Sequence, residues 1–253
     1  MRLMLICCAI LIGSLITGSK AIASAGVDKI TFMTEQYPPF NYEEQGKVQG
    51  MMVDILAEIF KKTNSRLTSK DIQLLPWARA YKSLQETPNT CLFSIGRSEA
   101  REKLFKWVGP VIDIKQVLLT KKSKKIKITE AKDLDKLQIG VIKDDYMDQH
   151  LTKLGIKKES IQKTSSSKAN ITKLVSDRLD GWAYGDLPAL WELKAAGQKT
   201  TDFESAYVFE TASVWFGFHK DTPQEVIDEI QKALDTIKSE GKAAAIIKKY
   251  TGT

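Results

Sequence analysis

Two strand-like stretches decide the fold: residues 111–120, which read VIDIKQVLLT, and residues 212–218, which read ASVWFGF. Both are apolar and rich in the β-branched and aromatic residues that favour strands. They lie far apart in the sequence, and strand-like and helix-like segments alternate between them. We predict that they are two strands crossing between two lobes, so that the chain leaves a first lobe, builds the second and returns.

This arrangement makes the first lobe discontinuous in sequence. It assigns residues 26–115 and 216–253 to lobe 1 and residues 120–210 to lobe 2, with hinges at about 116–119 and 211–215. The alternation of strands and helices predicts an α/β fold in which each lobe is a mostly parallel sheet flanked by helices. Ligands bind beyond the carboxyl ends of strands in such sheets, so the loops that follow strands are the candidate sites.

Hydrophobic periodicity locates the individual elements. The predicted strands are residues 30–33, 91–95, 137–142 and 179–184, and the predicted helices are residues 52–62 and 77–84. Residues 222–225, which read TPQE, have the pattern of a capping box with proline at the first helical position. The helix that follows carries its apolar face at Val226, Ile227, Ile230, Leu234 and Ile237.

The first 25 residues have the pattern of a secretory signal peptide. Arg2 supplies the positive start, residues 3–16 are almost wholly apolar, and small residues near positions 23–25 form the cleavage site. The apolar run is short for a membrane span, although a retained anchor is the alternative. We therefore expect an exported protein.

Composition excludes several classes of function. With 43% hydrophobic and 27% charged residues, the chain is an ordinary globular sequence and not a disordered or fibrous one. Two histidines and three cysteines do not supply the clustered ligands of a zinc site, so we predict no metal and no cofactor. No Ser/His/Asp constellation is visible, and we predict no catalytic residue. Cys91, the one cysteine after the leader, lies in an apolar run and is expected to be a buried thiol.

The net charge is +7, and six lysines gather within residues 115–127. No aromatic residue is interleaved with these lysines. We therefore interpret the cluster as a solvated surface and predict no nucleic-acid partner.

Three loops after predicted strands carry residues suited to recognition. The first contains Tyr37, which offers a flat apolar face and a hydroxyl. The second contains Ser94, Gly96, which permits close approach of the backbone, and Arg101, which can grip a carboxylate through two hydrogen bonds. The third contains Asp186, which can hold an ammonium group. Each has an alternative: Tyr37 fills the core, Arg101 lies on the surface, or Asp186 caps the next helix.

Four motifs carry a resemblance to a known family. They are residues 37–40 (YPPF) with 50–55, residues 94–101 followed by 103–110, residues 184–188 (YGDLP), and residues 239–250. In this order and spacing they resemble extracellular solute-binding proteins of family 3, the polar amino-acid-binding group with the type II periplasmic-binding fold. The resemblance covers essentially the whole mature chain.

The resemblance implies a function and roles for individual residues. In that family an arginine at the position of Arg101 binds the α-carboxylate, an aspartate at the position of Asp186 binds the α-ammonium, and an aromatic residue at Tyr37 packs on the ligand. It implies a periplasmic protein that captures a small amino-acid-like ligand by lobe closure and delivers it to an ABC permease, and that is not an enzyme. We expect a monomer, because one pair of lobes that closes on a solute needs no partner.

The chain departs from the family pattern at two places. Met51 stands where the family often has an aromatic residue. The loop after Ile142 contains Asp144, Asp145 and Tyr146 where small, hydroxyl-bearing residues are common, which hints at a ligand with extra positive charge. The alternative is that the two aspartates face solvent at a helix start.

Residues 76–79 (PWAR) add a further candidate wall, in which Trp77 stacks on a ligand or packs in the core and Arg79 contacts an anionic group. The predicted ligand-binding residues are Tyr37, Met51, Trp77, Arg79, Ser94, Gly96, Arg101, Ile142, Asp145, Tyr146 and Asp186.

Two other functions compete with transport. One is a ligand-binding sensor or accessory protein that works without an importer. The other is a periplasmic dehydratase of the cyclohexadienyl type on the same fold, in which Glu35, Asp145 or Asp186 would act as general acid or base.

Overall fold

The computed structural model describes residues 26–251, so the predicted signal peptide lies outside the described residues. The strands are β1 (Thr31–Thr34), β2 (Tyr42–Glu44), β3 (Lys47–Gln49), β4 (Gln73–Leu74), β5 (Thr90–Gly96), β6 (Phe105–Lys121), β7 (Ile139–Ile142), β8 (Ile161–Thr164), β9 (Gly181–Gly185) and β10 (Phe203–His219). The α-helices are α1 (Met51–Lys62), α2 (Trp77–Glu86), α3 (Glu99–Glu102), α4 (Tyr146–Lys153), α5 (Ser167–Val175), α6 (Asp186–Ala195), α7 (Gln224–Ser239) and α8 (Lys242–Thr251). None of the helices between residues 26 and 251 has the length and apolar character needed to cross a membrane.

One eight-stranded sheet runs through the molecule in the order β4-β1-β5-β10-β6-β9-β7-β8, and β2 and β3 form a separate hairpin. Strands β1, β4 and β5 are parallel to one another on one side. Strands β7, β8 and β9 are parallel on the other side. The two longest strands, β6 and β10, pair antiparallel in the middle. The predicted strands at residues 111–120 and 212–218 are therefore confirmed as this central pair.

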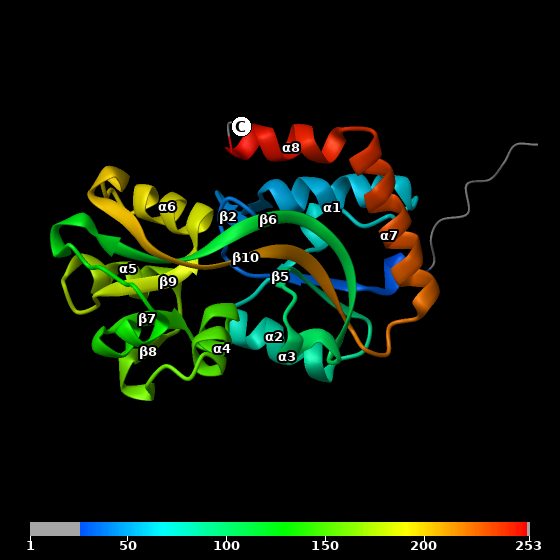
Figure 1. Ribbon diagram of the computed structural model, residues 1–253. Coiled ribbons are helices and arrows are strands. Elements are labelled where there is room, and N and C mark those ends of the chain that lie inside the picture. The colour runs from blue at the N-terminus through cyan, green and yellow to red at the C-terminus, as the bar shows by residue number, and fades with distance from the viewer. Residues whose placement is uncertain (1–25, 252–253) are drawn as a thin grey trace, which may run out of the picture.

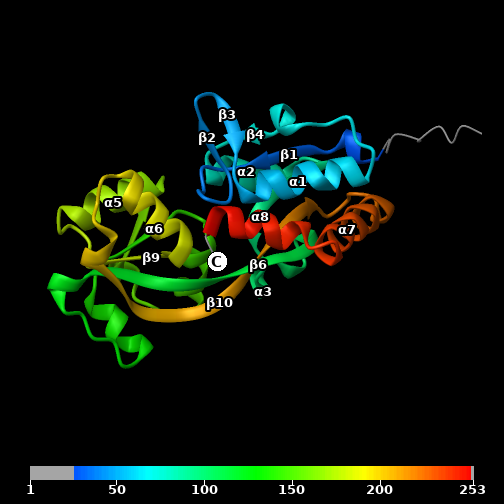
Figure 2. The same ribbon diagram turned by 90° about the horizontal axis from the view of Figure 1, so that it is seen from above.

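Strands β6 and β10 connect two groups of elements (Figure 1). Elements that lie between them in the sequence, β7 to β9 and α4 to α6, gather at one end of the long strands. Elements that precede β6 or follow β10 gather at the other end, and the second view shows the same separation (Figure 2). We call the first group lobe 2 and the second group lobe 1.

Apolar periodicity explains how the helices cover the sheet. The five predicted apolar residues of α7, which are Val226, Ile227, Ile230, Leu234 and Ile237, are all buried. Helices α1, α7 and α8 contact one another and cover one face of lobe 1 (Figure 1).

Cys91 is fully buried in β5, and burial raises the pKa of its thiol well above the usual value. The prediction of a buried, inert thiol is confirmed.

The predicted capping box at residues 222–225 is wrong. Helix α7 begins at Gln224 and its N-cap is Pro223, which makes no side-chain capping bond. The Thr222 hydroxyl is buried without a hydrogen-bond partner among the described residues, and the Thr222 carbonyl accepts a bond from Lys106 Nζ at 2.7 Å. The threonine therefore lies one residue too early to cap the helix, and its backbone ties α7 to β6.

Candidate ligand-binding site

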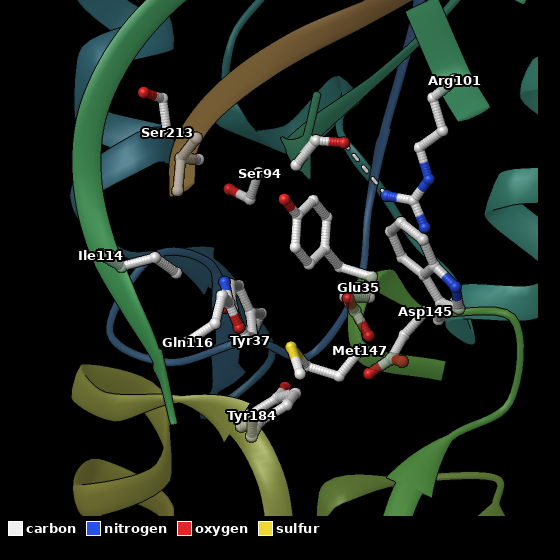
Figure 3. Close-up of a pocket in the computed structure, with 14 residues that line it drawn as sticks. Glu35, Tyr37, Ser94, Arg101, Ile114, Gln116, Asp145, Met147, Tyr184 and Ser213 are labelled. Carbon is white, nitrogen blue, oxygen red and sulfur yellow. Dashed lines mark hydrogen bonds between the residues drawn. The ribbon is translucent and has the colours of Figure 1, made fainter. Parts of the chain in front are cut away.

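A cavity of about 40 Å³ lies between the two lobes (Figure 3). We call it the inner chamber. Its volume accommodates a few water molecules, so the lobes are closely apposed. Its walls come from lobe 1, from lobe 2 and from the two long strands. They are Glu35, Tyr37, Trp77, Ser94, Gly96, Arg101, Ile114, Gln116, Asp145, Tyr146, Met147, Tyr184, Ser213 and Val214.

Most of the predicted ligand-binding residues meet at this chamber. They are Tyr37, Trp77, Ser94, Gly96, Arg101, Asp145 and Tyr146. They come from three predicted loops and from the start of α2, which lie far apart in sequence. Because the loops follow β1, β5 and β7, the chamber is located beyond strand ends as expected for an α/β sheet.

Four predicted residues do not line the inner chamber. Met51 is fully buried at the start of α1, and Ile142 is buried at the end of β7. Arg79 is exposed on α2. The Asp186 carboxylate accepts a 2.7 Å bond from the Leu187 amide at the first turn of α6. The structure therefore does not bring Asp186 and Arg101 together in one chamber.

Arg101 is the buried cation of the site. Its side chain is fully buried, and burial lowers the pKa of the guanidinium. Arg101 Nε donates to Gln149 Oε1 at 2.9 Å, Nη1 to the Gly96 carbonyl at 3.1 Å, and Nη2 to the Asp144 carbonyl at 3.3 Å. A guanidinium has five N–H donors, so these three bonds do not use all of them.

Aromatic rings surround the Arg101 guanidinium. Its Cζ lies 5.0 Å from the ring centroid of Tyr81, 5.2 Å from that of Trp77 and 5.8 Å from that of Tyr146. These cation–π contacts offset part of the desolvation cost. Within residues 26–251 Arg101 makes no ion pair with a carboxylate. A buried cation that makes no direct ion pair favours binding of an anionic ligand group.

Two carboxylates face the chamber from opposite lobes, Glu35 after β1 and Asp145 before α4 (Figure 3). Asp145 is 7% exposed, and its Oδ1 accepts a 2.8 Å bond from the Asp148 amide as the N-cap of α4. The alternative in which Asp145 faces solvent is thus wrong. The same side chain caps a helix and lines the chamber.

Burial gives both carboxyl groups unusual proton affinity. Burial, and then the charge of Asp145, raises the pKa of Glu35 to about 8, although Arg101 opposes the shift. Burial raises the pKa of Asp145 to about 7, against the lowering effects of the Asp148 amide and of Arg101. The chamber therefore holds one cation and two acids that need a positive partner in order to ionise.

Two buried donors in the chamber wall lack partners within the described residues. They are the indole N–H of Trp77 and the hydroxyl of Tyr184. Leaving such a donor unsatisfied costs about 1–3 kcal/mol. Tyr184 also packs edge-on against Tyr37, with ring centroids 5.3 Å apart. The walls thus combine aromatic surface with free donors, which suits a polar ligand with acceptor atoms.

A β-bulge aims Ser94 at the site. The pairing of β5 with β10 shifts register between Trp215 and Phe216, and Ser94 is the unpaired residue opposite. Its φ of 63° is in the left-handed region, and its hydroxyl donates to Asn41 Oδ1. Bulges are common next to functional sites because they re-aim a side chain.

Sequence reasoning missed several wall residues: Glu35, Ile114, Gln116, Met147, Tyr184, Ser213 and Val214. Glu35 was considered only as a possible general acid of an enzyme. Ile114 and Gln116 alternate on one face of β6, and this spacing could have indicated them once the strand was assigned to the site. Within the described residues, no group of His, Cys, Asp and Glu is arranged to hold a metal ion.

A closed chamber between two α/β lobes, joined by two long strands and lined by charges and aromatic rings, defines a solute-binding protein that closes on its ligand. Residues 30–253 match the bacterial extracellular solute-binding proteins, family 3, and the chain belongs to this family.

The chain is similar to curated proteins of known ligand. It is 25% identical over 222 residues to the L-cystine-binding protein TcyA of Bacillus subtilis (strain 168), covering 85% of this chain and 78% of the relative. It is 25% identical over 236 residues to the arginine-binding periplasmic protein of Mannheimia haemolytica, covering 91% of this chain and 94% of the relative. These relatives are binding proteins.

Solved structures share the fold. A histidine kinase sensor domain with similarity to periplasmic binding proteins has a TM-score of 0.78 at 16% identity, covering 88% of this chain and 96% of that chain. A substrate-binding protein of an ABC uptake transporter from Streptococcus pneumoniae, solved with bound histidine, has a TM-score of 0.78 at 19% identity, covering 89% of this chain and 94% of that chain. The predicted two-lobed α/β fold of the type II periplasmic-binding class is confirmed.

Proposed function

We propose that this protein captures a small amino acid with an additional positive charge by closing its two lobes on it. The observation that carries this proposal is that one inner chamber contains a buried guanidinium, Arg101, a buried acid, Asp145, and a half-buried acid, Glu35. With both acids ionised these three groups sum to one negative charge, which a ligand of net positive charge neutralises. L-arginine, L-lysine and L-ornithine have this charge.

The ligand carboxylate binds Arg101. Its planar guanidinium suits a planar carboxylate, and such charge-assisted pairs are stronger than neutral hydrogen bonds. Trp77 lines the same chamber, and its indole N–H has no hydrogen-bond partner among the described residues.

The ligand cation binds between Glu35 and Asp145. Because these acids belong to different lobes, the cation contacts both only when the lobes are closed. A ligand that prefers the closed form shifts the equilibrium towards it. Exclusion of water in the closed chamber strengthens each of these charge interactions.

The lobe division supports this mechanism. We propose lobe 1 at residues 26–115 and 216–253, lobe 2 at 120–210, and hinges at about 116–119 and 211–215. Gln116 and Ser213, in the proposed hinge strands, line the inner chamber, so a ligand there lies close to the axis about which the lobes close.

We propose that the protein is exported with cleavage near residues 23–25, and that it works as a periplasmic monomer that delivers its ligand to an ABC permease. The curated relatives support transport, because one is an arginine-binding periplasmic protein and another an L-cystine-binding protein. We propose that it is not an enzyme, since the buried arginine and the two acids line one chamber suited to holding a zwitterion.

Isothermal titration calorimetry of the mature protein tests the proposal. The ligands are L-arginine, L-lysine, L-ornithine, L-glutamine, L-cystine and a cyclohexadienyl carboxylic acid. Tighter binding of the three basic amino acids than of L-glutamine is expected. Binding of only neutral amino acids would overturn the cation site but keep the solute-binding function. Conversion of the cyclic acid to a product would replace transport with catalysis.

A further inference from the structure

A second cavity of about 310 Å³ lies next to the inner chamber. We call it the outer cavity. Its walls come from the loop and first turn of α3 (Ser98 and Ala100), from α4, and from Glu210 of β10. Tyr146 belongs to the walls of both cavities, so its ring is the partition between them.

Tyr146 is held in this position from both sides. A Cβ atom on Gly96 would lie 2.5 Å from Tyr146 Cδ2, so the ring packs directly on the glycine of the opposite lobe. The Tyr146 hydroxyl donates to Glu210 Oε1 at 3.0 Å. His150 Nδ1 lies 2.7 Å from the same oxygen. The His150 ring stacks on the Tyr146 ring, with ring centroids 6.2 Å apart. Glu210 and His150 are therefore positioning residues for the partition.

The outer cavity begins on the carboxylate-binding side of the inner chamber. Gln149, in the outer wall, accepts a 2.9 Å bond from Arg101 Nε. A ligand extended beyond its α-carboxyl group would therefore enter the outer cavity, whereas extension at its cationic end would not.

We propose that the outer cavity is a second compartment of the binding site, which accepts the far end of a dipeptide-sized ligand when Tyr146 turns aside. This inference rests on the proposed function, because the amino-terminal residue of the ligand occupies the inner chamber. The class of ligand is a dipeptide with a cationic amino-terminal residue. Its first carboxyl group is the peptide amide, whose carbonyl oxygen faces Arg101, and its terminal carboxylate lies in the outer cavity.

The outer cavity contains groups for the terminal carboxylate of the dipeptide. Lys153 lines it, and its ion pair with Glu99 joins two exposed side chains, at 67% and 83% exposure. Such surface pairs contribute little, so the ammonium group can turn to a ligand carboxylate. The Ser98 hydroxyl in the same wall has no hydrogen-bond partner among the described residues and can donate to the ligand.

The test compares L-arginine with the dipeptide L-arginylglycine by calorimetry on the mature protein. Ala100 is an exposed residue that lines the outer cavity and not the inner chamber, so Ala100→Trp fills the outer cavity alone. Ala244→Trp, at an exposed site on α8, is the matched control. Wild type and Ala244→Trp should bind both ligands. Ala100→Trp should weaken dipeptide binding at least 10-fold and change L-arginine binding less than 2-fold.

A second variant acts in the opposite direction. Tyr146→Phe keeps the aromatic ring and removes its hydrogen bond to Glu210. Rotation of the ring out of the partition position therefore costs less free energy. Dipeptide binding should tighten about 3- to 5-fold, as expected from the loss of one such hydrogen bond. This result is readable even where Ala100→Trp does not fold.

Three outcomes would overturn the proposal. The first is that wild type binds L-arginine but not the dipeptide. The second is that Ala100→Trp remains folded and weakens the binding of both ligands equally. The third is that Tyr146→Phe leaves the affinity for the dipeptide unchanged. If wild type binds neither ligand, the proposed function fails together with this inference. Loss of the dipeptide alone removes only the second compartment.

Discussion

Arg101 shows how one residue concentrates the chemistry of the site. It is a fully buried cation enclosed by three aromatic rings, with three of its donors used by lobe 1 and lobe 2 backbone and side-chain groups. It lines the inner chamber, where we propose that it binds a ligand carboxylate. A residue in this environment is sensitive to substitution, because its loss removes both the ligand contact and contacts between the lobes.

The Arg101→Ala substitution should therefore weaken L-arginine binding by about 2–5 kcal/mol, the usual loss when one partner of a buried charge pair is removed. Calorimetry provides the measurement. Arg79→Ala is the matched control, since Arg79 is exposed and does not line the inner chamber. Equal affinities of wild type and Arg101→Ala would remove Arg101 from the site.

Two acidic residues, Asp186 and Glu35, are candidates for binding the positive charge of the ligand. The family resemblance implies Asp186, whereas the chamber contains Glu35. We expect Glu35→Gln to weaken L-arginine binding at least 10-fold, within the range for a lost buried charge partner. Asp186→Asn should change it less, because the Asp186 carboxylate bonds to the Leu187 amide. The reverse order of the two effects would restore the role that the resemblance implies.

Proton affinity at the same two acids makes binding depend on pH. The raised pKa values, about 8 for Glu35 and about 7 for Asp145, mean that both closed-form carboxyls gain protons as the pH falls through this range. A protonated carboxyl does not attract a cation, so the affinity of the closed form for L-arginine should rise between pH 6 and pH 8 with release of protons. Titrations in buffers of different ionisation enthalpy measure that release. Affinity that falls with rising pH would contradict this sign, and Glu35→Gln should flatten the profile.

At the scale of elements, α4 must pack against the end of β5 for the chamber to close. The two elements meet at Gly96, because a Cβ there would lie 2.5 Å from the Tyr146 ring.

The predicted elements are confirmed within two residues at each end for β5, β7, β9, α1 and α2. The capping box failed because helix boundaries depend on tertiary contacts of single residues.

Gly96→Ala should hinder closure. We expect L-arginine binding to weaken about 10-fold, as for a strained or overpacked contact costing 1–3 kcal/mol. Gly140→Ala is a matched control, since its Cβ would lie 2.5 Å from Asn170 Oδ1, a contact between elements of lobe 2. The control should lower the melting temperature while retaining affinity. Full affinity in folded Gly96→Ala would show that closure does not need this contact.

At the scale of the whole molecule, the ligand and the lobes are coupled through β6 and β10. These strands connect the lobes, and their residues Ile114, Gln116 and Ser213 line the chamber. A ligand that contacts Arg101, Glu35 and Asp145 together stabilises the closed form over any open one.

Saturating L-arginine should therefore reduce the radius of gyration of the wild-type protein in solution, as measured by small-angle X-ray scattering. Arg101→Ala at the same ligand concentration should show a smaller change, because fewer molecules are bound. An unchanged radius in a protein that binds with a measured heat would indicate that binding does not require lobe movement.

The sequence by itself determined the alternation of elements, the two crossing strands, the buried thiol and the candidate residues Tyr37 and Arg101, because these depend on local periodicity and on short motifs. Only the tertiary structure decided that Glu35 and Asp145 share a chamber, that Asp186 lies outside it, and that Tyr146 separates two cavities. The physical reason is that these side chains lie in loops and at helix starts, whose relative placement depends on the packing of segments that are distant in the sequence. The bulge at Ser94 and the packing of α4 on Gly96 are set by contacts between distant segments.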